Sequence, residues 1–136
     1  MDQLIIALDP GREKCGIAVV HKEKGMFMKD VIPTAELTNR VQGLVANYHV
    51  KQIIVGDGTS SREARGCLDK IKIKDQPLHI ILIDEKNSTD EARCRYWKEN
   101  PPRGLMRFIP VTMQVPPKPV DDYVALILAE RYFANI

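Results

Sequence analysis

The stretch 5–20 constrains the fold more than any other part of the sequence. Its first apolar run is too short for a helix and ends in Asp9, and a Pro10-Gly11 turn then leads to a second apolar run that follows Gly16. This pattern predicts a β-hairpin whose first strand ends in an acid. Taken alone, Asp9 fits a turn-capping role or a ligand role, because Asp, Pro and Gly all favour turns.

The rest of the chain alternates between strand and helix patterns. Further strands are expected at 26–32, 51–55 and 78–83, and helices at 34–49, 88–100 and 119–133, with one more helix that starts at Ser60 and is ended by Asp75-Gln76-Pro77. Ser60 with Glu63 and Ser88 with Glu91 have the spacing of capping boxes. Prolines between the last two helices predict an irregular segment there.

This order of elements predicts an α/β fold with a five-stranded mixed sheet. The first three strands form an antiparallel meander, and the strands at 5–9, 51–55 and 78–83 form a parallel centre, with helices on both faces of the sheet. The strand at 78–83 is apolar enough to be expected in a central position. A length of 136 residues predicts one domain, 1–136.

Composition excludes several classes of function. No apolar run approaches the roughly 20 residues that span a membrane, and the N-terminus lacks a signal-peptide pattern, so we expect a cytoplasmic protein without membrane contact. The three cysteines are widely spaced and have no neighbouring histidine, which predicts reduced thiols and no zinc site. A net charge of +2 predicts that any nucleic-acid surface is local.

One local candidate surface combines cations with aromatic side chains. Tyr96 and Trp97 lie among basic residues, as in surfaces that bind single strands. Packing of both aromatic side chains on the core is an equally good interpretation. The basic residues are Arg93, Arg95, Lys98, Arg103 and Arg107.

Carboxylates recur where the expected strands end. Ligands of such sheets bind outside the carboxyl ends of the strands, which is where Asp9, Asp57, Asp84 and Glu85 are expected. Asp121 starts the last helix on or beside its apolar stripe, whereas Asp122 is expected to face solvent. Carboxylates without His or Cys suit Mg²⁺ or Mn²⁺, and a pair of such ions can hydrolyse a phosphodiester bond.

The ordered set of motifs resembles the YqgF family of Holliday-junction-resolvase-like proteins. That family belongs to the RNase H superfamily, is related to RuvC and includes pre-16S ribosomal RNA nucleases. The motifs are Asp9-Pro10-Gly11, Gly16-Ile17-Ala18-Val19, Ile53-Ile54-Val55-Gly56, Ile83-Asp84-Glu85, Ser88-Thr89, Glu91-Ala92-Arg93 and Val120-Asp121. The resemblance implies an RNase H-like fold and a metal-dependent endonuclease that acts on RNA or branched DNA as a monomer or homodimer.

Carried over position by position, the resemblance implies that Asp9, Glu85 and Asp121 form a catalytic triad that binds one or two Mg²⁺ or Mn²⁺ ions. Two departures bear on the substrate. Lys86 stands where the family commonly has Arg, and Asp57-Gly58-Thr59-Ser60-Ser61 replaces a loop that usually begins Leu-Pro. The residues expected to contact substrate are Gly11, Arg12, Lys14, Lys86, Arg93 and Arg103.

Three other interpretations remain open at this point. A catalytically silent RNase H-like domain would bind nucleic acid or protein without cleaving it. An actin-like phosphotransferase also has an Asp-x-Gly turn after its first strand, although such enzymes bind nucleotide between two domains. A thiol role for Cys15 would require a reactive thiolate, for which Arg12 and Lys14 are the only nearby cations in the sequence.

Overall fold

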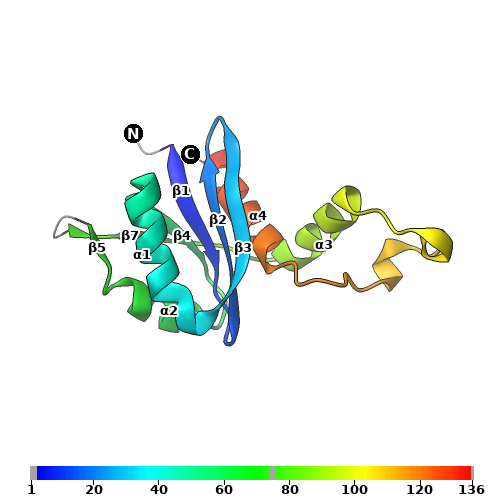
Figure 1. Ribbon diagram of the computed structural model, residues 1–136, viewed down its shortest axis with the longest axis horizontal. Helices are drawn as coiled ribbons and strands as arrows, with labels where there is room; N and C mark the ends of the chain where they lie inside the picture. The colour runs from blue at the N-terminus through cyan, green and yellow to red at the C-terminus, as the bar shows by residue number, and fades with distance from the viewer. Residues whose placement is uncertain (1–2, 74–75, 136) are drawn as a thin grey trace.

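The computed structural model describes residues 3–73 and 76–135, and its centre is a five-stranded mixed sheet (Figure 1). The strands are β1 (Leu4–Asp9), β2 (Lys14–His21), β3 (Gly25–Pro33), β4 (Gln52–Gly56) and β7 (His79–Ile83). They lie in the order β3-β2-β1-β4-β7, with antiparallel β1–β2 and β2–β3 pairs and parallel β1–β4 and β4–β7 pairs. The predicted meander, the parallel strands and the fold class are confirmed.

The strand register aligns the ends of three strands at one edge. Leu8 pairs with Val55, and Gly56 pairs with Ile83, so the chain leaves β1, β4 and β7 at similar heights. On the other side of β1, Asp9 pairs with Gly16 of β2. The residues that follow these strands therefore gather at one edge of the sheet, as expected for parallel neighbours.

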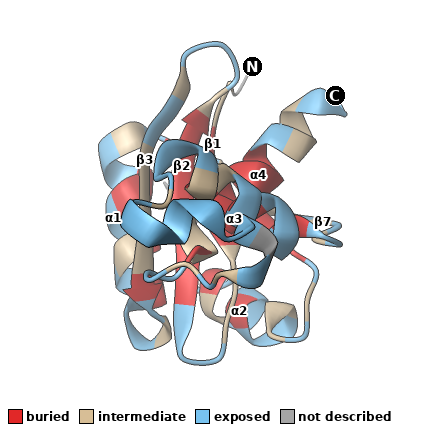
Figure 2. Ribbon diagram, turned by 90° about the vertical axis from the view of Figure 1, so that its right-hand side faces the viewer, coloured by how far each residue is buried: buried red, intermediate tan, exposed pale blue. Residues whose placement is uncertain are grey.

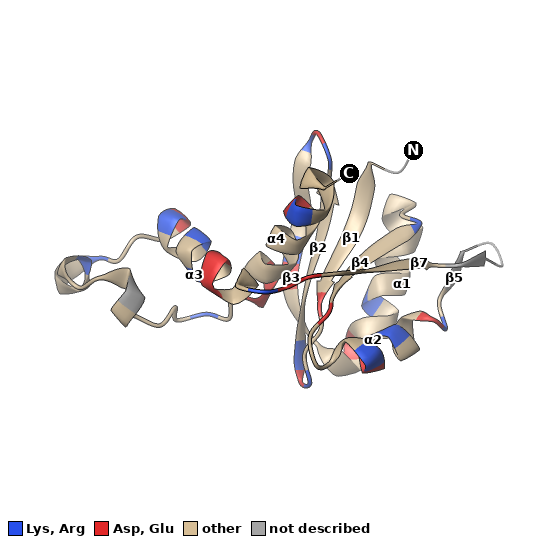
Figure 3. Ribbon diagram, turned by 180° about the vertical axis from the view of Figure 1, so that it is seen from behind, with Lys and Arg blue, Asp and Glu red and all other residues tan. Residues whose placement is uncertain are grey.

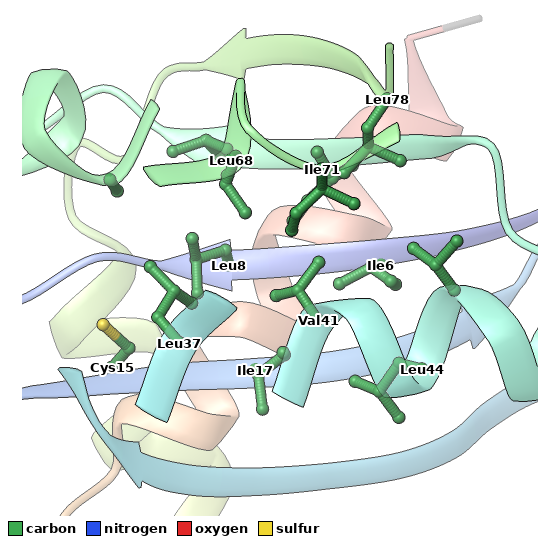
Figure 4. Close-up of a cluster of buried hydrophobic side chains, with 14 of the residues drawn as sticks. Ile6, Leu8, Cys15, Ile17, Leu37, Val41, Leu44, Leu68, Ile71 and Leu78 are labelled. Atoms are coloured by element: carbon green, nitrogen blue, oxygen red, sulfur yellow. The ribbon is translucent and has the colours of Figure 1, made fainter. Parts of the chain in front are cut away.

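Two helices cover one face of the sheet. They are α1 (Leu37–Tyr48), which follows a 3-10 turn at Thr34–Glu36, and α2 (Ser61–Leu68). Alternate strand residues point to this face because side chains in a strand alternate between the two faces. Figure 4 shows Ile6, Leu8 and Ile17 of the sheet meeting Leu37 and Val41 of α1 in one buried cluster. The helix predicted over 34–49 is present as α1, with its first turn, Thr34–Glu36, in a 3-10 conformation and His49 as its left-handed C-cap.

The opposite face is covered by α4 (Asp121–Ala134), and α3 (Ser88–Glu99) packs on the outer side of α4. Every residue from Tyr123 to Ala129 is buried, as the red colour of α4 in Figure 2 shows. The sequence predicted one apolar stripe on this helix. The stripe widens to the full circumference because α4 lies between the sheet and α3.

The strand β7 lies at the edge of the sheet, so the prediction of a central position was wrong. Its apolar run reflects partial burial on both faces: Ile80 packs against the α1 side, Ile81 against the α4 side, and Leu82 remains 44% exposed. An edge strand that is packed on both faces has the same sequence pattern as a central strand.

The second predicted helix ends earlier than expected, at Leu68. The chain then forms a small hairpin of β5 (Lys72–Ile73) and β6 (Gln76–Pro77), which was not predicted, while Asp75 lies outside the described residues. Ile71 and Leu78 flank this hairpin and are 2% and 4% exposed, so burial on the α1 side holds its ends.

Neither predicted capping box forms. Ser60 is the N-cap of α2 but makes no side-chain capping hydrogen bond. Ser88 is the first residue of α3, behind Asn87, whose φ of 62° starts the helix from a left-handed conformation. Between α3 and α4 the irregular segment contains only the short 3-10 helices η2 (Gly104–Phe108) and η3 (Val111–Met113). None of the helices in the described part of the chain is long and apolar enough to cross a membrane.

Candidate active site

Asp9 is the last residue of β1, and four fully buried residues, Ile5 to Leu8, precede it. The strand pairs on both sides fix the backbone beneath the carboxylate, since β1 lies between β2 and β4. The turn that follows depends on Gly11. A Cβ at this position would lie 2.1 Å from the Lys14 carbonyl oxygen, so no other residue fits without moving the turn.

Asp121 is brought to Asp9 by a close backbone contact. Gly16, the strand partner of Asp9, lies against the first turn of α4, where an added Cβ would stand 1.8 Å from the Asp121 carbonyl oxygen. Only a glycine allows the helix to start this close to the strand. The glycine that opens the second apolar run in the sequence therefore determines where the third acid lies.

Glu85 lies against the loop that follows β4. Added Cβ atoms at Gly56 and Gly58 would stand 2.4 Å and 1.9 Å from the Glu85 carboxylate oxygens. Gly58 donates a backbone hydrogen bond to this carboxylate. The Glu85 backbone N–H donates to Asp57 Oδ1 at 3.2 Å, and the Asp57 N–H donates to the Ile83 carbonyl at 3.0 Å. The Gly56–Gly58 loop thus positions Glu85 through both its backbone and its side chain.

The three carboxyl groups interact electrostatically, with Asp9 in the middle. Burial raises the pKa of Asp9 to about 7, assisted by the charges of Glu85 and then Asp121. Burial also raises the pKa of Glu85 and of Asp121, while Lys14 opposes the shift at Asp121. Burial and the charges of both other acids therefore act together on Asp9 to disfavour its ionised form.

The donor set fits a hard cation by its chemistry, because it offers carboxylate oxygens without His or Cys. Within residues 3–73 and 76–135, however, no three side chains of the His, Cys, Asp or Glu type are gathered closely enough to hold one ion. The raised pKa shows that the ionised form of Asp9 is disfavoured at this edge, and a bound cation would stabilise that ionised form.

Among the cations expected to contact substrate, Lys14 forms an ion pair with one of the acids. Its Nζ is 3.9 Å from Asp121 Oδ2, and its side chain is 54% exposed. Arg12 is exposed in the turn after Asp9, and Lys86 is exposed directly after Glu85. Arg93 on α3 and Arg103 beyond it are also exposed, but they belong to the layer outside α4.

The structure contradicts one sequence prediction here and decides between two open interpretations of another residue. Asp122 does not face solvent: its side chain is 15% exposed, less than the 29% of Asp121, and pairs with Lys29 at 2.8 Å. For Tyr96 the core-packing interpretation is confirmed, because its side chain is 8% exposed and packs edge-on against Tyr123. Asp122 belongs to α4 and Tyr96 packs against it, and the position of α4 between two layers is a tertiary feature that helical periodicity does not reveal.

The thiol of Cys15 is fully buried, with its Sγ 3.3 Å from Thr34 Oγ1, so it is not exposed to a thiol reagent. The roles of Gly58 and Asp57 were missed at the sequence level. The pattern Gly56-Asp57-Gly58 after a strand was the available signal, since glycines that flank an acid indicate close backbone approach.

Comparison with known protein families gives a match to the Tex protein YqgF-like domain over residues 3–90. The chain belongs to this family. The match includes Asp9 and Glu85 and ends before α4, so the family confirms the predicted YqgF-like resemblance over the sheet and its first helices. The comparison with the sequences of curated proteins found no match.

Solved structures show the same fold over nearly the whole chain. A structure of Thermus thermophilus RuvC is similar with a TM-score of 0.58 at 15% identity, covering 97% of this chain and 95% of RuvC. T. thermophilus RuvC in complex with a Holliday junction substrate is similar with a TM-score of 0.57 at 18% identity, covering 98% and 95%. The fold of the YqgF-like chain is therefore RNase H-like, including the part beyond residue 90.

Proposed function

We propose that this protein is a metal-dependent endonuclease that hydrolyses phosphodiester bonds in structured nucleic acid, with Asp9, Glu85 and Asp121 as ligands for Mg²⁺ or Mn²⁺. The observation that supports it is the electrostatic coupling of Asp9 to Glu85 and Asp121, which come from distant parts of the chain. Their proximity and burial raise the pKa of Asp9 to about 7. Such perturbed groups cluster at functional sites.

Each acid has a distinct structural support. Asp9 stands on a buried strand, Glu85 on the Gly56–Gly58 loop, and Asp121 on the first turn of α4 against Gly16. When bound, a hard divalent ion supplies a water activated for attack and a countercharge for the leaving oxygen. The protein's own contribution is to hold the carboxylates at a partly buried edge where like charges favour a cation.

The expected substrate follows from the family and the neighbouring cations. RuvC, which has the same fold, is known in complex with a Holliday junction, and this supports branched DNA as one candidate. Precursor ribosomal RNA is the second candidate. Arg12, Lys14 and Lys86 are exposed around the acids and would contact the phosphates that flank the cleaved bond.

One observation favours a second candidate, a binding module without catalysis. No three potential ligands in the described part of the chain converge on one point, and Lys14 lies 3.9 Å from the Asp121 carboxylate that a metal would need. In this function the same cations would bind nucleic acid, and the acids would remain unmetallated.

A comparison of wild type with Asp9→Asn tests both candidates. A four-way DNA junction and a precursor ribosomal RNA would be incubated with 5 mM Mn²⁺, and binding would be measured in parallel with EDTA present. The nuclease proposal predicts cleavage by wild type that falls at least 100-fold in Asp9→Asn while binding persists.

The matched control is Asp30→Asn, since Asp30 lies on β3 and pairs with Arg40 at 3.0 Å rather than with the three acids. This variant should cleave like wild type. If wild type and both variants bind either nucleic acid but none of them cleaves it, the result would support the binding module and overturn the nuclease proposal.

A further inference from the structure

Residues 103–118, which we call the arm, expose large apolar side chains to solvent. Leu105 is 84% exposed, Phe108 71%, Met113 76% and Val115 81%. Elsewhere in the described chain the most exposed large apolar residues reach 44%. Exposed apolar groups concentrated in one segment mark an interaction site rather than ordinary surface.

The arm extends beyond the layers of the fold. Figure 1 shows that it continues from α3 on the side of α4 that faces away from the sheet. Polar contacts, rather than a hydrophobic core, join its first half to its second half. Gln114 Nε2 donates hydrogen bonds to the carbonyls of Met106 at 2.9 Å and Ile109 at 2.8 Å. The apolar side chains are thus held in a defined loop without being used to stabilise it.

The charges of the arm have a single sign. Arg103, Arg107 and Lys118 are exposed, and no Asp or Glu occurs between residues 100 and 120. In Figure 3 the ribbon beyond α3 carries blue but no red until α4 begins. Among the described residues none of these three cations has an ion-pair partner. The Arg107 guanidinium lies 4.8 Å from the centroid of the Phe108 ring.

The base of the arm contains a hollow of about 400 Å³ lined by Trp97, Arg103, Met106 and Gln114, among others. The Nε1 atom of Trp97 is buried and has no hydrogen-bond partner in the described part of the chain. A buried donor without a partner is unfavourable unless a ligand or water accepts its hydrogen bond. The hollow therefore places the cation of Arg103 beside the apolar side chains of Trp97 and Met106.

The arm is also tied to the acidic edge by chain connectivity. The segment formed by α3 and the arm leaves the sheet just after Glu85 and returns at Val120, which is buried directly before Asp121. Two of the three acids thus bracket this segment.

We propose that the arm is a docking surface for unpaired nucleotides of the nucleic acid bound at the acidic edge. The inference rests on the proposed function only in taking nucleic acid as the ligand. Phosphates fit the three unpaired cations, and unpaired bases can stack on Phe108 and cover the neighbouring apolar groups. A second copy of the arm is a poorer partner, because like charges would face one another.

The test measures binding without cleavage, in EDTA, by fluorescence anisotropy. The probes are a labelled 15-nucleotide single strand and a duplex of the same length. Phe108→Ala should weaken single-strand binding about tenfold, as expected for the loss of one stacked base, and should affect duplex binding much less. Arg103→Ala with Arg107→Ala should lower the salt slope on the single strand by about 1.4.

Matched controls come from the far end of the sheet. Phe27, which is 43% exposed on β3, and the exposed Lys22 and Lys24 of the β2–β3 turn provide Phe27→Ala and Lys22→Ala with Lys24→Ala. These variants should bind both probes like wild type. Circular dichroism would confirm that every variant is folded.

Three results would overturn the inference. One is equal loss of binding in the arm variants and the controls, and another is the absence of single-strand binding by wild type. The third is a dimer, detected by light scattering, that Phe108→Ala converts to a monomer while single-strand binding is unchanged, because the arm would then bind protein. The nuclease proposal is tested separately, by the comparison of cleavage by wild type and by Asp9→Asn.

Discussion

The acidic edge and the arm differ in how the fold supports them. The acids stand at the ends of elements with a filled core beneath them: Ile5 to Leu8 are fully buried before Asp9, and the residues from Tyr123 to Ala129 are buried after Asp121. The arm has short 3-10 turns, polar links through Gln114 and apolar side chains in solvent. Buried elements therefore position the acidic edge, whereas the arm leaves its apolar side chains exposed to solvent.

This difference separates two requirements of a site that acts on a polymer. Groups that take part in chemistry must be held within about 0.5 Å of their productive positions, which a packed scaffold provides. Groups that bind a variable partner gain from exposure and can contribute their apolar area to the complex. Substitutions in the two regions should therefore differ in whether they change stability or binding.

The largest effect is expected from Gly16→Ala. The new Cβ would stand 1.8 Å from the Asp121 carbonyl oxygen, so α4 must shift, and the free energy of unfolding should fall by about 3 kcal/mol. Urea denaturation would measure it. In the control Gly43→Ala on α1 the added methyl meets no atom within 4 Å, and it should raise stability by about 0.5–1 kcal/mol. Equal stability of Gly16→Ala and wild type would contradict the close packing of α4 at the acidic edge.

A smaller effect, which depends on pH, is expected from Asp9→Asn. Because the pKa of Asp9 is about 7 in the folded protein against 3.8 ordinarily, the native carboxyl group binds its proton more tightly, and ionisation destabilises the fold as pH rises from about 4 to 7. Asn removes this cost. The variant should be more stable than wild type at pH 8 by roughly 2 kcal/mol, after allowance for solvent screening, and by much less at pH 4.5.

Thermal unfolding of both proteins across this pH range would measure the difference. Addition of Mn²⁺ at pH 8 should stabilise wild type more than Asp9→Asn, because the ion binds the ionised carboxylate. A stability difference that does not change with pH would show that Asp9 is not held in a charged and partly buried cluster.

Gly58→Ala should affect the site more than the fold. The added Cβ would lie 1.9 Å from Glu85 Oε1, which is the end of a flexible side chain, so Glu85 should swing away at a cost in stability below about 1 kcal/mol. Cleavage, or Mn²⁺ affinity measured by calorimetry, should fall about tenfold. Gly66→Ala on α2, where nothing lies within 4 Å, is the control. Unchanged Mn²⁺ affinity in Gly58→Ala would show that the Gly56–Gly58 loop does not position Glu85 for metal binding.

The smallest effect on stability is expected in the arm. Leu105→Ser removes a side chain that is 84% exposed and should change the free energy of unfolding by less than about 0.5 kcal/mol. Leu128→Ala in the fully buried part of α4 should cost about 3 kcal/mol. Urea titrations of both variants would make the comparison, and a loss above about 1 kcal/mol for Leu105→Ser would show that the arm packs on the core.

Local patterns in the sequence were sufficient for the order of the helices and the five central strands, though not for the β5–β6 hairpin, and for the candidate acids. The apolar run from Ile5 to Leu8 is too short for a helix and identifies a strand, and helical spacing from Leu37 to Tyr48 identifies α1, because both patterns reflect backbone geometry within a few residues. The position of Asp9 at a strand end follows from the same local rules. These rules also predicted that the segment after α3 would lack a long regular element.

Only the tertiary structure decided what each face of an element meets. Asp122 pairs with Lys29, Tyr96 packs in the core, and β7 lies at an edge because of contacts between residues far apart in the sequence. The closeness of Asp121 to Asp9 depends on Gly16, and the support of Glu85 depends on Gly58. Local patterns in the sequence therefore determined which residues are candidates for the site. Long-range packing decided the distances between these residues and their exposure, because both depend on contacts between residues far apart in the sequence.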